Sequence, residues 1–69
     1  MITDEEKLAC VERELRTRRW NYPKWVWSGR ITQLHADTEI ALMDAIADDY
    51  RRKIALAAAN AGFAAMGGG

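Results

Sequence analysis

The segment Gly29-Arg30-Ile31-Thr32 separates two long stretches of helical periodicity in this 69-residue chain. Gly29 suits the end of a helix, because a left-handed residue often closes a helix and glycine adopts that conformation without strain. Thr32 suits the start of the next helix, because its hydroxyl can accept a hydrogen bond from a free backbone N–H group. Ile31 and Ala36 occupy the positions of a hydrophobic staple around that start. So short a connection predicts two helices that pack antiparallel.

The first helix is predicted over residues 4–28. Thr3 followed by Glu6 is a capping box, in which the threonine hydroxyl accepts a bond from a free backbone N–H group. Large side chains then recur at alternating intervals of three and four residues, as in a heptad seam. The seam consists of Leu8, Val11, Leu15, Arg18, Tyr22 and Trp25. Pro23 removes one helical hydrogen bond. The seam stays in phase beyond it, which favours a kink near Pro23 over a helix that stops and restarts there.

The second helix is predicted over residues 33–59. Its seam again alternates four and three residues and consists of Ala36, Ile40, Met43, Ala47, Tyr50, Ile54 and Ala57. Leu42 and Ile46 widen the apolar surface beyond this seam, which is typical of a helix with more than one neighbour. Asn60 and Gly62 lower the helix propensity. We therefore expect the second helix to fray after about Ala59, leaving residues 60–69 as a flexible Ala/Gly tail.

These features predict an all-α fold, a two-helix antiparallel hairpin that dimerises into a four-helix bundle. A chain of this length has a marginal core and usually needs a disulfide, a metal or oligomerisation. Cys10 is the only cysteine and His35 the only histidine. An internal disulfide is therefore impossible, and the usual zinc ligand set is missing. Oligomerisation remains, so a second copy of the chain is the first expected partner.

The charges are arranged in blocks although the net charge is zero. Residues 15–30 carry five basic and no acidic side chains, whereas residues 37–49 carry five acidic and no basic ones. The first 14 residues carry five acidic side chains, and Arg51-Arg52-Lys53 follow the acidic block of the second helix. A hairpin places opposite blocks side by side. Exposed ion pairs of this kind set register more than stability.

The strongest candidate for a binding surface is the basic and aromatic segment 13–30. Trp20 and Trp27 lie seven residues apart on one side of the first helix, away from the seam. Trp and Arg are enriched among interface hot spots, so this side predicts a contact surface, either for a second copy or for a foreign protein. The predicted partner-binding residues are Trp20, Trp27, Arg16, Arg19 and Lys24.

A different class of function is also open. Arg16, Arg18, Arg19 and Lys24 can neutralise phosphates while tryptophans stack on bases, which is typical of a small nucleic-acid-binding regulator. The zero net charge disfavours this alternative, because such domains are usually basic. A purely structural subunit of a larger assembly is a third possibility.

Other chemistry is not indicated by the sequence. We expect no enzyme, since no nucleophile, base or carboxylate pair has the spacing of a catalytic site. We expect no cofactor and no metal, and interpret Asp44 and Asp48 as part of a solvated acidic face. Cys10 is interpreted as a small buried hydrophobic residue. The acidic N-terminus lacks the pattern of a signal peptide, no apolar run reaches the roughly 18 residues of a membrane span, and a lone thiol suits a reducing compartment. The expected location is therefore cytoplasmic.

Several segments together resemble small proteins encoded by temperate phages and prophages of proteobacteria. They are Tyr22-Pro23-Lys24-Trp25-Val26, Gly29-Arg30-Ile31-Thr32-Gln33, Ala36-Asp37, Glu39-Ile40 and the run from Met43 to Tyr50. The likeness covers most of residues 5–53. Characterised proteins of this type include small helical dimers that act as anti-activators of host regulators such as quorum-sensing transcription factors. The resemblance implies a non-enzymatic, phage-encoded inhibitor of a host regulatory protein, and it transfers no binding residue.

Overall fold

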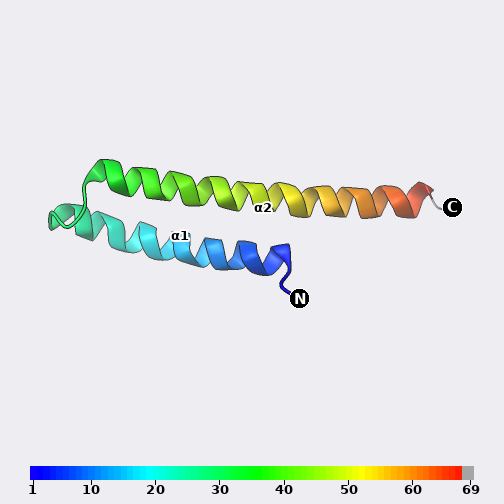
Figure 1. The fold of residues 1–69 in the computed structure, drawn as a ribbon, viewed down its shortest axis with the longest axis horizontal. Coiled ribbons are helices and arrows are strands. Elements are labelled where there is room, and N and C mark those ends of the chain that lie inside the picture. Colours follow the sequence, from blue (N-terminus) through cyan, green and yellow to red (C-terminus); the bar gives the residue numbers. More distant parts are fainter. Residues whose placement is uncertain (68–69) are drawn as a thin grey trace.

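The computed structural model describes the backbone of residues 1–67 and the side chains of residues 1–62. Two helices, α1 (Asp4–Trp27) and α2 (Gln33–Gly67), run antiparallel and lie side by side (Figure 1). The molecule measures 61 × 21 × 15 Å, and the far end of α2 projects beyond the start of α1. No strand occurs within residues 1–67. The all-α hairpin predicted from the sequence is thus confirmed.

The start of α1 is fixed as the capping pattern predicts. The hydroxyl Oγ1 of Thr3 accepts a hydrogen bond from the backbone N–H of Glu6 at 3.1 Å. Asp4, Glu5 and Glu6 occupy the first turn, where the helix dipole favours negative charge. The helix then continues through Pro23 to Trp27, so the alternative of a helix that stops and restarts at the proline is wrong. A kink at that position stays a prediction.

The turn between the helices is a Schellman motif built around Gly29. This residue has a φ of 76°, the left-handed conformation that glycine tolerates best. The N–H of Arg30 donates to the carbonyl of Trp25 at 2.8 Å, and the N–H of Gly29 donates to that of Val26 at 3.1 Å. The Arg30 guanidinium also lies 5.0 Å from the centroid of the Trp25 ring, which covers the last turn of α1. At the start of α2, the N–H of His35 donates to Oγ1 of Thr32 at 3.0 Å, which confirms the predicted cap.

The predicted end of the second helix is wrong. Instead of fraying after Ala59, α2 continues to Gly67, so residues 60–67 belong to the helix and only Gly68 and Gly69 lie outside the described residues. Alanine is the strongest helix former, and alanines stand at positions 57, 58, 59, 61, 64 and 65, before, between and after Asn60 and Gly62. Asn60 and Gly62 each disfavour the helix by at most about 1 kcal/mol relative to alanine. Isolated costs of this size do not end a helix that alanines continue on both sides.

The core of the hairpin is thin. Leu15, Tyr22, Ala36 and Ala47 are buried, and the other predicted seam residues from Leu8 to Ile54 are half-buried. The rings of Tyr22 and Trp25 pack with centroids 5.5 Å apart. Ala57 is exposed, contrary to its predicted seam position, because it lies near the point where α1 no longer covers α2.

One broad face of the hairpin carries the ion pairs that the charge blocks predict. Nη2 of Arg19 lies 2.8 Å from Oδ2 of Asp44, and Nη2 of Arg51 lies 3.5 Å from Oε2 of Glu12. Both pairs join α1 to α2. Because their side chains are about half exposed, they contribute little stability, and they fix the register of the two helices. We call this surface the ion-pair face.

Candidate protein-binding surfaces

The side of α1 that points away from α2 presents two exposed tryptophans. Trp20 is 71% exposed and Trp27 is 92% exposed. At about 100° per residue, Trp20 lies on the opposite side of the helix from its seam neighbours Arg18 and Tyr22. Residues before and after Trp20 on the same side of the helix form with it what we call the outer face of α1. The outer face consists of Arg13, Arg16, Trp20, Lys24 and Trp27. The predicted position of both tryptophans away from the seam is confirmed.

The cations of the outer face are not neutralised by the hairpin. Among the side chains of residues 1–62, Arg13, Arg16 and Lys24 form no ion pair with a carboxylate. The ammonium of Lys24 instead lies 4.4 Å from the centroid of the Trp20 ring. A cation–π contact of this kind holds the flat ring and the positive charge together on one surface. The outer face therefore combines large apolar area with unpaired positive charge.

Two other basic residues of the segment 13–30 are engaged within the hairpin. Arg19 binds both carboxylate oxygens of Asp44, at 2.8 and 2.9 Å. Arg18 lies in the seam, where it contacts Glu14 at 2.9 Å and Glu39 at 3.3 Å. The hydrogen bond to Glu14 is the main cause that raises the pKa of Arg18 above its ordinary value, so this guanidinium is always charged. The structure thus separates Arg18 and Arg19 from Arg16, Lys24 and the two tryptophans.

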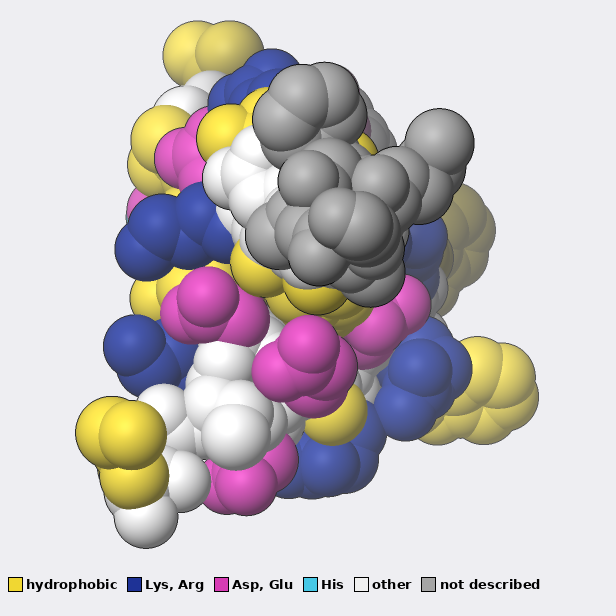
Figure 2. Space-filling view, turned by 90° about the vertical axis from the view of Figure 1, so that its right-hand side faces the viewer, with side chains coloured by type: hydrophobic (Ala, Val, Ile, Leu, Met, Phe, Trp, Pro, Cys, Tyr) yellow, Lys and Arg dark blue, Asp and Glu magenta, His cyan; other side chains and the backbone are white. Residues whose placement is uncertain are grey.

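The broad face opposite the ion pairs is largely apolar, and we call it the apolar face. It is formed by Cys10 and Val11 of α1 together with Leu42, Ile46 and Tyr50 of α2. Leu42 and Ile46 are 54% and 42% exposed, and a groove between the helices is lined by Val11, Ile46 and Tyr50. Seen from the end at which α2 projects, hydrophobic side chains reach the outline of the molecule at several places between charged groups (Figure 2).

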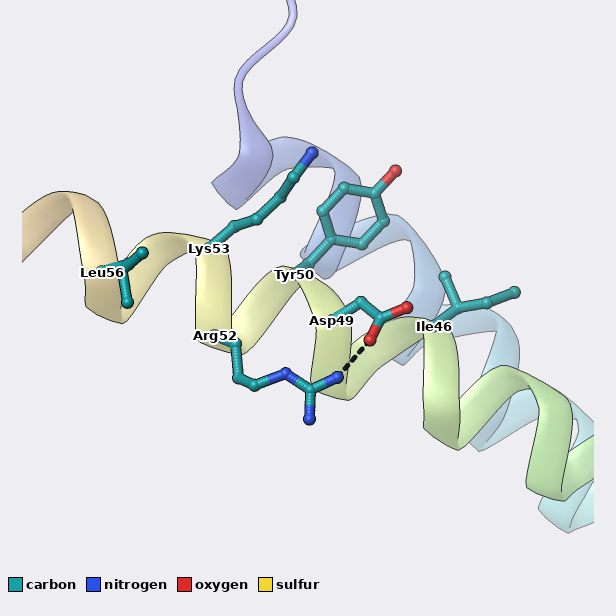
Figure 3. Close-up of a pocket in the computed structure, with 6 residues that line it drawn as sticks. All are labelled: Ile46, Asp49, Tyr50, Arg52, Lys53 and Leu56. Atoms are coloured by element: carbon teal, nitrogen blue, oxygen red, sulfur yellow. Dashed lines mark hydrogen bonds and ion pairs between the residues drawn. The ribbon is translucent and has the colours of Figure 1, made fainter.

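Tyr50 marks the centre of a second shallow hollow on the apolar face. Its lining residues come from α2 and are Ile46, Asp49, Tyr50, Arg52, Lys53 and Leu56 (Figure 3). The ammonium groups of Lys7 and Lys53 lie 5.8 and 5.6 Å from the centroid of the Tyr50 ring. Asp49 and Arg52 form an ion pair at the margin of the hollow. Ile46 and Tyr50 line both hollows, so the apolar surface is continuous.

The interpretation of Cys10 as a buried residue is wrong. Its side chain is exposed, because it lies beside Val11 but outside the seam that packs against α2. His35 is also exposed, in the first turn of α2. Within the described residues, no three His, Cys, Asp or Glu side chains are grouped as metal ligands would be. In the same part of the chain, no helix combines the length and apolar character that crossing a membrane requires.

Comparisons of this chain with protein families, with curated proteins and with solved structures found no match. The chain is therefore described by its own fold and surfaces: it is a two-helix hairpin with one apolar face and one basic, aromatic outer face. The resemblance to phage-encoded regulators stays a prediction.

Proposed function

We propose that this protein is a homodimeric, non-enzymatic binding module that captures another protein through the outer face of α1. The observation that carries the proposal is the exposure of Trp20 and Trp27 on the side of the helix that points away from the described part of α2. Large apolar side chains exposed together are a typical mark of an interaction site. Tryptophan is also the residue type that most often anchors a protein interface.

The charge of the outer face indicates the kind of surface it binds. Arg13, Arg16 and Lys24 share this side of the helix with the tryptophans and form no ion pair with a carboxylate among residues 1–62. A complementary surface has apolar pockets for two indole rings and acidic groups at its margin. In such a complex the tryptophans supply most of the affinity. Arg16 and Lys24 act at the rim, where they affect the association rate and its salt dependence.

The proposed identity of the partner comes from the resemblance to small phage-encoded anti-activators. It is a regulatory protein of a bacterial host, in the cytoplasm, that this chain inhibits. A helical face with two bulky anchors suits that role, because an amphipathic helix can occupy a groove on a folded protein without any catalytic step.

One observation favours a nucleic acid as the alternative partner. The ammonium of Lys24 lies beside the exposed indole ring of Trp20, and Trp27 is 92% exposed. Binding to phosphates releases counterions, so the logarithm of the affinity then falls steeply with the logarithm of the salt concentration. Binding through indole rings in protein pockets depends much less on salt.

The test is capture of a partner from nuclease-treated bacterial lysate by the wild-type chain and by Trp20→Ala and Trp27→Ala. Each truncation should weaken binding about thirtyfold, which corresponds to about 2 kcal/mol for an interface anchor. Leu34→Ala is the matched control, because Leu34 is 77% exposed on α2 and lies away from the outer face. Circular dichroism and sedimentation show whether each variant keeps the fold and the dimer.

Three results would contradict the proposal. The first is capture that is equally strong with both tryptophan variants. The second is capture that disappears after nuclease treatment or falls with the salt slope of phosphate contacts. The third is a tryptophan variant that folds but no longer dimerises, which would place the outer face in the self-interface.

A further inference from the structure

A second heptad-like seam runs along α2 beside the one that packs against α1. Its members are Glu39, Leu42, Ile46, Asp49 and Lys53, at alternating intervals of three and four residues. This spacing is the pattern by which a helix packs along another helix. Leu42 and Ile46, the apolar members, are 54% and 42% exposed, so the described chain leaves about half of each side chain uncovered.

Two of the three charged members of this second seam, Glu39 and Lys53, lie at equal distances on either side of Ile46. Glu39 lies seven residues before Ile46, and Lys53 lies seven residues after it. A two-fold axis brings together residues at equal distances on either side of it. Two antiparallel copies of α2 centred on Ile46 therefore place Glu39 of each copy beside Lys53 of the other. The same operation places Leu42 beside Tyr50 of the other copy.

Both charged groups are available for this contact. Glu39 uses Oε2 for its 3.3 Å contact with Arg18, which leaves Oε1 for a second partner. Lys53 forms no ion pair with any side chain of residues 1–62, and its ammonium lies beside the ring of Tyr50. A new Glu39–Lys53 pair therefore breaks no existing ion pair.

The centre of symmetry also coincides with the middle of the hairpin. The 24 residues of α1 are long enough to lie beside about the first 24 of the 35 residues of α2, which are residues 33–56. The midpoint of that paired part of α2 lies within two residues of Ile46. Two hairpins related by this axis overlap along their whole paired length. At 1.5 Å per residue, a face about 36 Å long and 21 Å wide covers roughly 750 Å², close to the ~800 Å² that each partner contributes to a standard stable interface.

We propose that the apolar face is the interface between two copies of this chain, with α2 packed antiparallel on α2 about a two-fold axis at Ile46. The inference rests on the dimer of the proposed function and specifies its geometry. It does not depend on the identity of the foreign partner. A symmetric interface needs a self-complementary surface, and the bulky apolar side chains of this face come mainly from α2. Packing α2 on α2 therefore joins the largest apolar areas of both copies.

The first experiment reverses the charges of the second seam and measures the dimer dissociation constant by sedimentation. Lys53→Glu creates two symmetric repulsions and should weaken the dimer about tenfold, since exposed pairs contribute at most about 1 kcal/mol each. The double variant Glu39→Lys with Lys53→Glu restores the opposite charges and should recover the wild-type constant within about threefold. Lys24→Glu is the matched control, with the same chemical change at an exposed side chain of the outer face, away from the second seam.

A second experiment tests the geometry without altering the charges. In a Cys10→Ala background, Ile46→Cys should form a disulfide between copies under mild oxidation, because the two-fold axis brings both sulfur atoms together. Leu34→Cys should not, since it lies far from the axis. In the wild-type chain, the rate of alkylation of Cys10 should fall as the protein concentration rises through the dimer dissociation constant, because Cys10 lies on the apolar face.

The outcomes separate this inference from the proposed function. A dimer that responds equally to Lys53→Glu and Lys24→Glu, and that does not cross-link at position 46, overturns the proposed interface and leaves the dimer itself intact. A wild-type chain that stays monomeric and fully helical at micromolar concentration overturns both the dimer and its interface. Capture of the foreign partner through Trp20 and Trp27 is measured separately and can fail or succeed in either case.

Discussion

Replacement of Leu15 by alanine tests whether the seam holds the hairpin together. Leu15 is only 3% exposed and is the one leucine among the four side chains that are buried within residues 1–62. Removing three buried carbons costs roughly 2.4 kcal/mol in transfer free energy, at about 0.8 kcal/mol per carbon. The cavity left behind adds to this, and Leu→Ala changes in protein cores cost about 2–5 kcal/mol. Because the thin hairpin can close partly around the gap, we expect a loss of about 2–3 kcal/mol.

The size of that loss relative to the total makes it easy to measure. A chain of 69 residues has an unfolding free energy of roughly 3–10 kcal/mol, at about 0.05–0.15 kcal/mol per residue. The assay is urea unfolding followed by far-ultraviolet circular dichroism, at one fixed chain concentration because dimerisation makes stability concentration-dependent. Leu34→Ala makes the same chemical change at a side chain that is 77% exposed, and should cost less than about 0.5 kcal/mol. Equal losses for the two variants would refute the packing described for the seam.

Three further substitutions probe the turn, the end of α2 and the seam cation. Gly29→Ala should lower the melting temperature, because a φ of 76° costs a residue with a Cβ about 1 kcal/mol or more. An unchanged melting temperature would contradict the left-handed conformation of residue 29 in the turn. Gly62→Ala should raise the melting temperature slightly, because the added Cβ meets nothing within 4 Å and alanine is favoured over glycine in a helix by up to about 1 kcal/mol. A lower melting temperature would show that this segment is not helical. Arg18→Met keeps an apolar stem in the seam and should change the unfolding free energy, measured by urea unfolding, by no more than about 1 kcal/mol. A decrease of more than about 3 kcal/mol would show that the ion pairs of Arg18 hold the hairpin together.

The helices, their caps and their facing seams were predictable because each depends on local spacing and on residue type. The phase of the large side chains from Leu8 to Trp25 continues across Pro23, so the proline could be placed inside the helix. The Gly29 and Thr32 positions defined the turn for the same reason. The end of α2 was not predictable in this way, because Asn60 and Gly62 argue for fraying while the surrounding alanines argue for helix. The sum of these propensities decided the outcome.

The candidate site was predictable in part. The positions of Trp20 and Trp27 away from the seam follow from counting residues. Which cations remain unpaired does not follow from charge blocks, because pairing depends on the angle of each side chain relative to the seam. Arg18 lies in the seam and Arg19 beside it, so both reach the acids of α2. Arg13, Arg16 and Lys24 form no ion pair within residues 1–62, although Arg16 lines a hollow together with Arg19 and Asp44.

Acrylamide quenching of tryptophan fluorescence tests most directly whether the protein has two separate surfaces, one for itself and one for a partner. In a Trp25→Phe background only Trp20 and Trp27 emit, and they are 71% and 92% exposed in the single chain. Quenching should stay equally strong, with emission typical of indole in water, as the concentration is raised from the monomer to the dimer. A clear loss of quenching or a blue shift on dimerisation would bury the tryptophans in the self-interface and contradict the account.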